Sequence, residues 1–464
     1  MKNLIKCVVF TCILSITLAI TYKILSWKDT TGAYISATEQ LYNTDDNLID
    51  VVFLGSSHTY CGIYPAVLWN MYGIAAFDMA VSGQDRDSTV HYLKEVLKTQ
   101  KPSVVCVDLY GLLFDRQEVI GNAYRNMLGM KTSKNSVELV KDYVDMEEWG
   151  DYILRWPIIH TRYRELDKYD FIENPLNEFC RGEYVTWEGY GGTLDPKVLE
   201  CDEIADIAGK KLDWLNELLE LSRENDFELV LFEAPMKLTD SNMRVLNAAK
   251  AFAGEHDIPF ILFNELVDEL EFNQGLDMTD DFHCNADGAV KVTSYFGEYL
   301  ASNYDLPDHR GDIKYEIWNR DAEYLEHMIA AHKMNDIYAE DNYSYVQMLS
   351  ECDNMTVIVS CNGDYFGAIP YLGELGIEED DLLGGGKYLL ENGTLRQILS
   401  GSDTASIELP MSKYDTFLIK NADGITDVLL NTNSEISVTD GINIIVYDNM
   451  LNKLVSKRGL VAFE

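Results

Sequence analysis

Two short motifs that lie far apart in the sequence contain the residue types of a serine hydrolase triad. The first is G-S-S-H at residues 55–58, directly after an apolar run, and the second is D-D-F-H at residues 280–283. A serine hydroxyl attacks an acyl carbon efficiently when a base accepts its proton and hydrogen-bond donors stabilise the oxyanion. We therefore predict Ser57 as the nucleophile, His283 as the general base and Asp280 as the residue that orients the imidazole.

Other polar residues near these motifs have competing explanations. Asp281 is the weaker candidate for orienting His283, because adjacent side chains diverge. His58 directly follows the nucleophile and could contact substrate, but a helix-start or loop residue at the rim of the cleft is the simpler interpretation. Arg162 could bind an anionic substrate, and a structural salt bridge is the alternative that we favour.

The elements around the first motif alternate between strand-like and helix-like patterns, which predicts an α/β domain with a parallel sheet. Such a sheet would present Ser57 at the carboxyl ends of its strands, where open α/β folds bind ligands. Residues 112–200 interrupt the alternation and predict a helical insertion. The expected strands cover residues 49–54, 75–81, 103–109, 228–232 and 259–263, and the expected helices cover about 203–223 and 285–300.

The order of these motifs resembles the SGNH, or GDSL-like, hydrolase superfamily over roughly residues 48–305. Ser56 stands where the commonest family motif has aspartate, and Gly83 in A-V-S-G-Q matches the glycine whose amide joins the oxyanion hole. The resemblance implies a three-layer, flavodoxin-like fold. It also implies that the Ser57 amide is a second donor of the oxyanion hole.

One family block is different in this chain. Residues 107–111 read V-D-L-Y-G where the family often has G-x-N-D, so the third oxyanion donor is left open between Gln84 and a residue of the insertion. Variant motifs of this kind occur in proteins of bacterial cell-envelope acylation. The chain resembles the D-alanyl transfer protein of teichoic-acid systems and the alginate O-acetylation proteins, which also join a membrane anchor to an external domain.

The N-terminus has the pattern of a signal anchor. Residues 7–22 are apolar or weakly polar, and Lys2 and Lys6 precede them. The absence of an A-x-A cleavage pattern favours retention of residues 1–30 as a transmembrane helix over a cleaved signal peptide. The two lysines predict an inside N-terminus. We therefore expect a single-pass protein of the cell membrane with an extracytoplasmic catalytic domain, joined to the helix by a linker over residues 31–47.

Composition excludes some functions. The chain has 77 acidic and 37 basic residues and a formal charge of −40, which argues against binding nucleic acid. Nine cysteines are scattered without a C-x-x-C motif, a pattern that predicts neither a zinc site nor a disulfide scaffold. We expect no metal and no cofactor.

The last part of the chain predicts a second domain. Residues 306–350 are expected to form a connector, and residues 351–464 resemble an ILEI/PANDER-like domain through V-I-V-S at 357–360 and G-I-N-I-I-V-Y-D at 441–448. The resemblance implies a small noncatalytic α/β or β-rich module. Contact with carbohydrate and a purely structural or protein-binding role both stay open for it.

Together these observations predict a membrane-anchored serine acyl-transfer enzyme, either an O-acetyltransferase or an esterase, that acts on a cell-surface polysaccharide or other glycan. The envelope resemblance suggests a multispanning membrane O-acyltransferase as a partner. The alternative is a noncatalytic glycan-binding protein that has kept the SGNH fold, which the missing third donor would explain.

Overall fold

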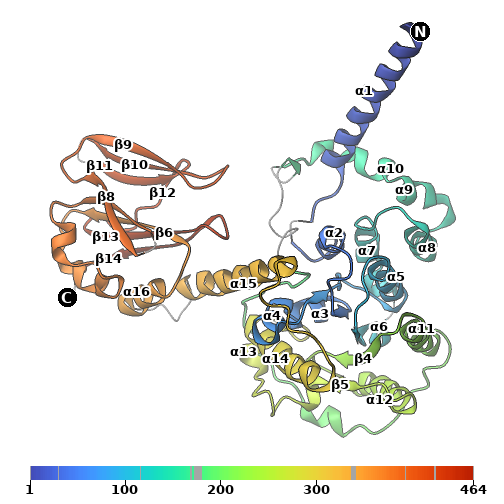
Figure 1. Ribbon diagram of the computed structural model, residues 1–464. Coiled ribbons are helices and arrows are strands. Elements are labelled where there is room, and N and C mark those ends of the chain that lie inside the picture. Colours follow the sequence, from blue (N-terminus) through green and yellow to red (C-terminus); the bar gives the residue numbers. More distant parts are fainter. Residues whose placement is uncertain are drawn as a thin grey trace. The chain divides into compact units, whose positions relative to one another are not determined.

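The computed structural model describes residues 2–29, 31–114, 116–167, 170–171, 180–335, 341–391, 393–422 and 425–462. The chain divides into two compact units, Met1–Ala322 and Glu323–Glu464 (Figure 1). The first unit is α/β and contains a parallel sheet, and the second contains two antiparallel sheets. The fold class is therefore α/β with additional antiparallel sheets and one N-terminal apolar helix.

Helix α1 (Lys2–Leu25) is the N-terminal apolar helix. Its segment Asn3–Leu25 is long and apolar enough to cross a membrane, and none of the most apolar window is buried in the protein. A signal sequence has the same length and composition. The helix therefore agrees with a membrane-spanning segment and with a signal peptide alike.

The parallel sheet forms the centre of the first unit. Its strands follow the order β2-β1-β3-β4-β5, and every neighbouring pair is parallel. The residues of β1, β2 and β3 are all buried, although successive side chains point to opposite faces, so both faces of the sheet are covered. All five predicted strands are present, and each boundary lies within three residues of its predicted place: β1 (Val51–Leu54), β2 (Ala76–Asp78), β3 (Val104–Asp108), β4 (Glu228–Glu233) and β5 (Phe260–Leu262).

Helices connect these strands and surround the sheet in Figure 1. The helix predicted over about residues 285–300 is confirmed as α14 (Ala286–Asn303). Its N-cap Asn285 accepts a hydrogen bond from the Gly288 amide at 3.1 Å. The helices that follow the strands are α3 (Ser57–Gly62), α4 (Pro65–Tyr72), α5 (Arg86–Val96), α11 (Lys210–Asn225), α12 (Asp240–Glu255), α13 (Gln274–Asp277) and α14 (Ala286–Asn303), with one short 3-10 turn, η6 (Phe263–Glu265).

The predicted start of the helix over residues 203–223 is wrong, because α11 begins only at Lys210. Tertiary hydrogen bonds hold the preceding segment in an irregular conformation. The Ala205 amide donates to the Arg244 carbonyl at 2.9 Å, and the Asn247 side chain donates to the carbonyls of Cys201 and Glu203. These contacts come from α12 and outweigh the apolar periodicity of the local sequence.

The insertion between β3 and α11 is helical over its first half, as predicted. Residues 168–169 and 172–179 of the predicted insertion lie outside the described residues, and residues 183–195 contain no helix. The helical elements are α6 (Tyr110–Leu113), α7 (Arg116–Asn126), α8 (Lys134–Tyr143), η1 (Met146–Glu148), α9 (Trp149–Leu154), α10 (Trp156–Ile159), η2 (His160–Arg164) and η5 (Pro196–Glu200).

The second unit contains two antiparallel sheets that share one apolar core. Their orders are β14-β13-β6-β7-β8 and β12-β11-β10-β9. Side chains such as Ile358 and Ile445 of the first sheet pack with Phe417 and Ile419 of the second, as in a sandwich. The strands are β6 (Met355–Asn362), β7 (Gly386–Glu391), β8 (Thr394–Ser400), β9 (Ala405–Pro410), β10 (Thr416–Ala422), β11 (Ile425–Leu430), β12 (Asn433–Ser434), β13 (Gly441–Asp448) and β14 (Lys453–Leu460).

Helices precede and interrupt these strands. The division between the units falls within α15, at residue 322, inside the segment expected to be a connector. The predicted strand at 355–360 and the predicted terminal hairpin are present as β6, β13 and β14. The helices are η7 (Ile313–Tyr315), α15 (Glu316–Asn335), α16 (Asn342–Ser350), η9 (Phe366–Leu375) and η10 (Glu379–Leu382).

A buried ion pair in the second unit predicts a pH-dependent stability. His327 Nδ1 lies 2.7 Å from Asp448 Oδ2, and the hydrogen bond to Asp448 raises the pKa of His327 above its ordinary value. Because the pKa of His327 is higher in the folded state, protonation of His327 stabilises the fold. This stabilisation is complete below the unfolded pKa, about 6.5, and is lost as pH rises through the raised folded-state pKa. We expect the free energy of unfolding of this unit to decrease as pH rises above about 6.5 and through the raised pKa of His327.

Denaturant titrations of the full chain in detergent at several pH values check this expectation. His327→Gln should remove this decrease and lower stability by about 1–3 kcal/mol at acidic pH, because it leaves Asp448 without its charged partner. His160→Gln, at an exposed position in the first unit, is the control. An identical pH dependence in wild type and His327→Gln would contradict the prediction.

Candidate active site

The turn after β1 sets the position of Ser57. Gly55 follows the strand, Ser56 is the N-cap of α3, and Ser57 is the first residue of that helix. A Cβ atom at Gly55 would lie 2.0 Å from Thr59 Oγ1 and 2.6 Å from Asp108 Cβ, so only glycine fits. The nucleophile candidate is therefore held at the carboxyl edge of the sheet by a turn that has no room for a side chain.

A tight loop before α14 holds the other two triad candidates. The Thr279 amide donates to the His283 carbonyl at 2.8 Å, and a β-bridge joins Met278 to Cys284. Within the loop, Asp280 Oδ1 accepts from the amides of Phe282, at 2.7 Å, and of His283, at 3.0 Å. The backbone of the loop thus fixes the Asp280 carboxylate relative to the His283 ring.

The structure brings Ser57, His283 and Asp280 together in one chain of hydrogen bonds. Ser57 Oγ lies 2.8 Å from His283 Nε2, and His283 Nδ1 lies 2.9 and 2.8 Å from the two oxygens of Asp280. With the proton of the imidazole on Nδ1, Nε2 is the acceptor for the Ser57 hydroxyl. This is the arrangement in which a histidine can act as general base toward a serine.

The pKa shifts of the two ionisable groups suit these roles. Partial burial acts to raise the pKa of Asp280, but hydrogen bonds from the His283 ring and two backbone amides outweigh it, so the pKa lies below its usual value. Burial lowers the pKa of His283, the neighbouring His58 lowers it further, and the attraction of Asp280 opposes both. At neutral pH Asp280 is therefore ionised, and His283 is neutral and able to accept a proton.

Ser57 and His283 face a hollow of about 270 Å³. Its lining combines apolar carbon surface with hydroxyl groups. The residues around it are Thr31, Ala33, Tyr34, Ser57, Tyr60, Cys61, Ser82, Tyr184, Thr186, Thr279 and His283. A group that enters this hollow would meet the Ser57 hydroxyl among side chains that can both cover carbon atoms and form hydrogen bonds.

One wall of the hollow comes from the segment just after α1, which the sequence analysis assigned to a linker. The buried Asp29 carboxylate accepts hydrogen bonds from the amides of residues 31, 32, 34, 35 and 36, at 2.7–3.3 Å, and folds the segment into a compact loop. The Ala33 carbonyl accepts from the Ser82 amide at 2.7 Å. Helix α2 (Ser36–Asn43) follows, with Ala37 and Leu41 buried.

No sequence pattern marked these residues. Their loop is held by hydrogen bonds between one carboxylate and main-chain groups, and such contacts leave no periodic pattern of apolar residues in the sequence.

The predicted oxyanion-hole residues are Ser57 itself and Gly83, which is next to a residue that lines the hollow. Gly83 has φ 63° and follows Ser82, a lining residue of the hollow. Within the described part of the chain, the amides of Ser57 and Gly83 donate no hydrogen bond. Gln84 is different, because its side chain is buried and its Nε2 donates to the Met79 carbonyl at 3.0 Å. In this conformation Gln84 does not supply the third donor.

The two other candidates for substrate contact have internal partners. His58 is 2% exposed and lies against Glu233, so it is behind the triad and not at the rim of the cleft as we expected. Arg162 Nη2 pairs with Asp170 Oδ1 at 2.9 Å, and the guanidinium also donates to the carbonyls of Leu25 and Ser26. Arg162 thus has the structural ion pair that the sequence analysis favoured.

Comparison with known proteins adds little to this geometry. No family model matches the chain, and no curated protein matches it. Among solved structures, a protein of Bacteroides fragilis described as a "putative acylhydrolase" is similar at 11% identity and a TM-score of 0.30, over 58% of this chain and 94% of that one. This likeness is too slight to bear on the fold or the reaction.

The close contacts around Gly55 predict that a substitution at this position destabilises the protein. Gly55→Ala should lower the free energy of unfolding by about 1–3 kcal/mol, because the added methyl group overlaps Thr59 and Asp108. Gly150→Ala in α9 is the matched control, since nothing lies within 4 Å of the new Cβ and alanine favours helix. Denaturant titration compares them, and equal midpoints for the two variants would refute the packing argument.

Proposed function

We propose that this protein is a serine-dependent acyl-transfer enzyme, either an esterase or an O-acyltransferase. The observation that carries the proposal is the hydrogen-bonded chain from Asp280 through His283 to Ser57, which ends at a hollow open to solvent. The aspartate, histidine and serine are hydrogen-bonded in the order that acyl transfer requires, and they lie at the carboxyl edge of a parallel sheet. This arrangement suits acyl transfer better than binding alone.

The proposed reaction has two halves. Ser57 Oγ attacks the acyl carbon while His283 Nε2 takes the hydroxyl proton, and the amides of Ser57 and Gly83 stabilise the negative charge on the acyl oxygen. His283 then protonates the leaving oxygen, which leaves an acyl-serine. In the second half His283 removes a proton from water or from an acceptor hydroxyl, whose oxygen attacks the acyl carbon. The bond from the acyl carbon to Ser57 Oγ then breaks, and His283 returns its proton to Ser57 Oγ. Asp280 stabilises the imidazolium in both halves.

The hollow supports a choice of substrate class. Its volume of about 270 Å³ is smaller than typical drug-sized sites, which span roughly 300–1,000 Å³, and suits a short acyl group. Tyr34, Tyr60 and Tyr184 line it, and tyrosine side chains are of the kind that contact sugars. We infer an O-acetyl group on a glycan as the substrate.

The cellular setting of the proposal rests on sequence. Helix α1 would anchor the enzyme in the cell membrane with the catalytic unit outside, beside a cell-surface polysaccharide and a multispanning O-acyltransferase partner. The variant SGNH motifs and the apolar N-terminus support this setting. The ILEI/PANDER-like second unit would be an accessory module.

A glycan-binding protein without catalysis is the second candidate. The observation that favours it is the Gln84 side chain, which donates to the Met79 carbonyl and so does not supply the third oxyanion donor. Covalent labelling separates the two candidates.

Labelling by a fluorophosphonate tests Ser57 as the nucleophile. The full chain in detergent should become labelled at Ser57, and both Ser57→Ala and His283→Ala should abolish labelling, because the first removes the attacking oxygen and the second its base. A protein whose fluorophosphonate signal persists in Ser57→Ala, or that takes no label at all, is not the proposed enzyme.

The two adjacent aspartates give a matched test of the orienting residue. Asp280→Asn should reduce the rate of acetyl release from p-nitrophenyl acetate or acetylated oligosaccharides by about 10²–10⁴-fold, because the imidazole loses its correct tautomer and its counter-charge. Asp281→Asn should have little effect, because Asp281 pairs instead with Lys237 at 3.1 Å. Equal losses in the two variants would contradict the assignment of Asp280.

A further inference from the structure

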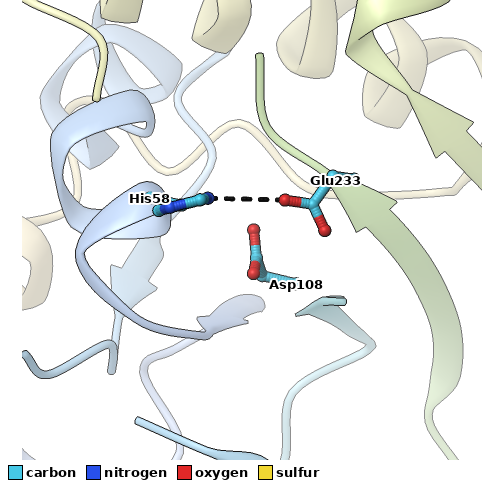
Figure 2. Close-up of side chains that lie close together, drawn as sticks. All are labelled: His58, Asp108 and Glu233. Atoms are coloured by element: carbon cyan, nitrogen blue, oxygen red, sulfur yellow. Dashed lines mark hydrogen bonds and ion pairs between the residues drawn. The ribbon is translucent and has the colours of Figure 1, made fainter. Parts of the chain in front are cut away.

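A second group of polar side chains lies directly behind the nucleophile and takes no part in the proposed reaction. His58 follows Ser57 in α3, Asp108 is the last residue of β3, and Glu233 is the last residue of β4 (Figure 2). The three side chains are buried, with exposures of 2%, 2% and 0%. One ligand-type atom from each lies within 4.8 Å of the others.

Hydrogen bonds compensate only part of the negative charge of this group, since Asp108 Oδ1 accepts from the Tyr110 amide at 2.8 Å. His58 Nδ1 and Glu233 Oε1 are 3.4 Å apart, a long distance for a hydrogen bond. Glu233 Oε2 and Asp108 Oδ2 are buried and have no hydrogen-bond partner. Among the described residues, neither carboxylate pairs with a lysine or an arginine. Buried carboxylates in this situation must be protonated or must have a cation between them.

The donor set indicates which cation would fit. One imidazole nitrogen with two carboxylate oxygens is a ligand combination that first-row divalent ions accept, Zn²⁺ among them. Figure 2 shows the Asp108 carboxylate directed toward the gap between His58 and Glu233. Three atoms no more than 4.8 Å apart can all lie within about 2.8 Å of one point, so shifts below 1 Å reach the roughly 2.0–2.2 Å of Zn–N and Zn–O bonds.

We propose that His58, Asp108 and Glu233 bind one divalent transition-metal ion, with Zn²⁺ as the best match to the ligands. The ion has a structural and positioning role. It joins the first turn of α3 to the ends of β3 and β4, and so fixes the main chain that carries Ser57. The His58 ring packs edge-on against the His283 ring, with centroids 5.5 Å apart, so the ion also holds one side of the triad.

No spacing motif in the sequence marks this site, because its ligands come from three separate elements. Residues 58, 108 and 233 meet only because parallel strands end at the same edge of the sheet. The proposal does not depend on acyl transfer. A protein that binds glycan without catalysis would need the same turn, so loss of the metal site and loss of the reaction are separate results.

Metal analysis of the full chain tests the proposal. The protein in detergent is stripped with a chelator, dialysed and titrated with Zn²⁺ alone, and bound zinc is counted by mass spectrometry. We expect one ion per chain in wild type, and at least about 100-fold weaker binding in Glu233→Gln and in Asp108→Asn, which lose a ligand charge but keep their shape. Asp78→Asn is the matched control, since Asp78 is a buried carboxylate with an unpartnered oxygen outside the trio.

Two further measurements distinguish binding at this site from misfolding of the variants and from binding of metal by the free cysteines. Zn²⁺ should raise the melting temperature of wild type and of Asp78→Asn but not of Glu233→Gln, because an ion that binds only the folded state stabilises it. Substitution by Co²⁺ should give a spectrum of nitrogen and oxygen ligands. The proposal is overturned if stripped wild type binds no stoichiometric ion, if Glu233→Gln binds as wild type does, or if Co²⁺ shows thiolate charge-transfer bands.

Discussion

The turn between β1 and α3 has no space for a side chain at Gly55. Both the triad that contains Ser57 and the buried cluster that contains His58 depend on that constraint. Because the chain turns so sharply, Ser57 faces the hollow while His58, one residue later, faces the interior. A wider turn would move both side chains away from the sheet edge. One steric limit therefore sets the position of the nucleophile candidate and of the buried cluster behind it.

The carboxylates on the two sides of this turn differ in how their charge is stabilised. Asp280 is partly exposed and accepts hydrogen bonds from the His283 ring and two amides, so its ionised form is favoured. Glu233 is fully buried, and one of its oxygens has no partner. Water and main-chain donors stabilise the first group, whereas the second needs a proton or a cation. Similar residues at one sheet edge therefore support different chemistry.

Prediction from sequence succeeded where the signal is local. The apolar runs predicted the five parallel strands, and the N-cap at Asn285 predicted the start of α14. The D-x-x-H motif predicted which residues would approach Ser57, although the catalytic role assigned to them stays a prediction. His283 and Ser57 are 226 residues apart in the sequence, and they meet because a parallel sheet brings the ends of its strands together.

Failures occurred where distant main-chain groups decide the structure. Contacts from α12 keep residues before Lys210 out of the helix that their periodicity predicts. The buried cluster of His58, Asp108 and Glu233 joins residues with no common motif, and the contacts of Gln84 and Arg162 depend on neighbours that sequence does not identify.

The loop around Asp29 has a practical consequence for protein engineering. A soluble version of this protein would normally be made by deleting the apolar helix and starting the coding region a few residues later. Starting after Asp29 would remove the acceptor of five backbone amides and unfold the wall that carries Thr31 and Tyr34. An expression boundary should therefore fall between Leu25 and Asp29, so that the soluble version keeps the hollow beside Ser57 intact.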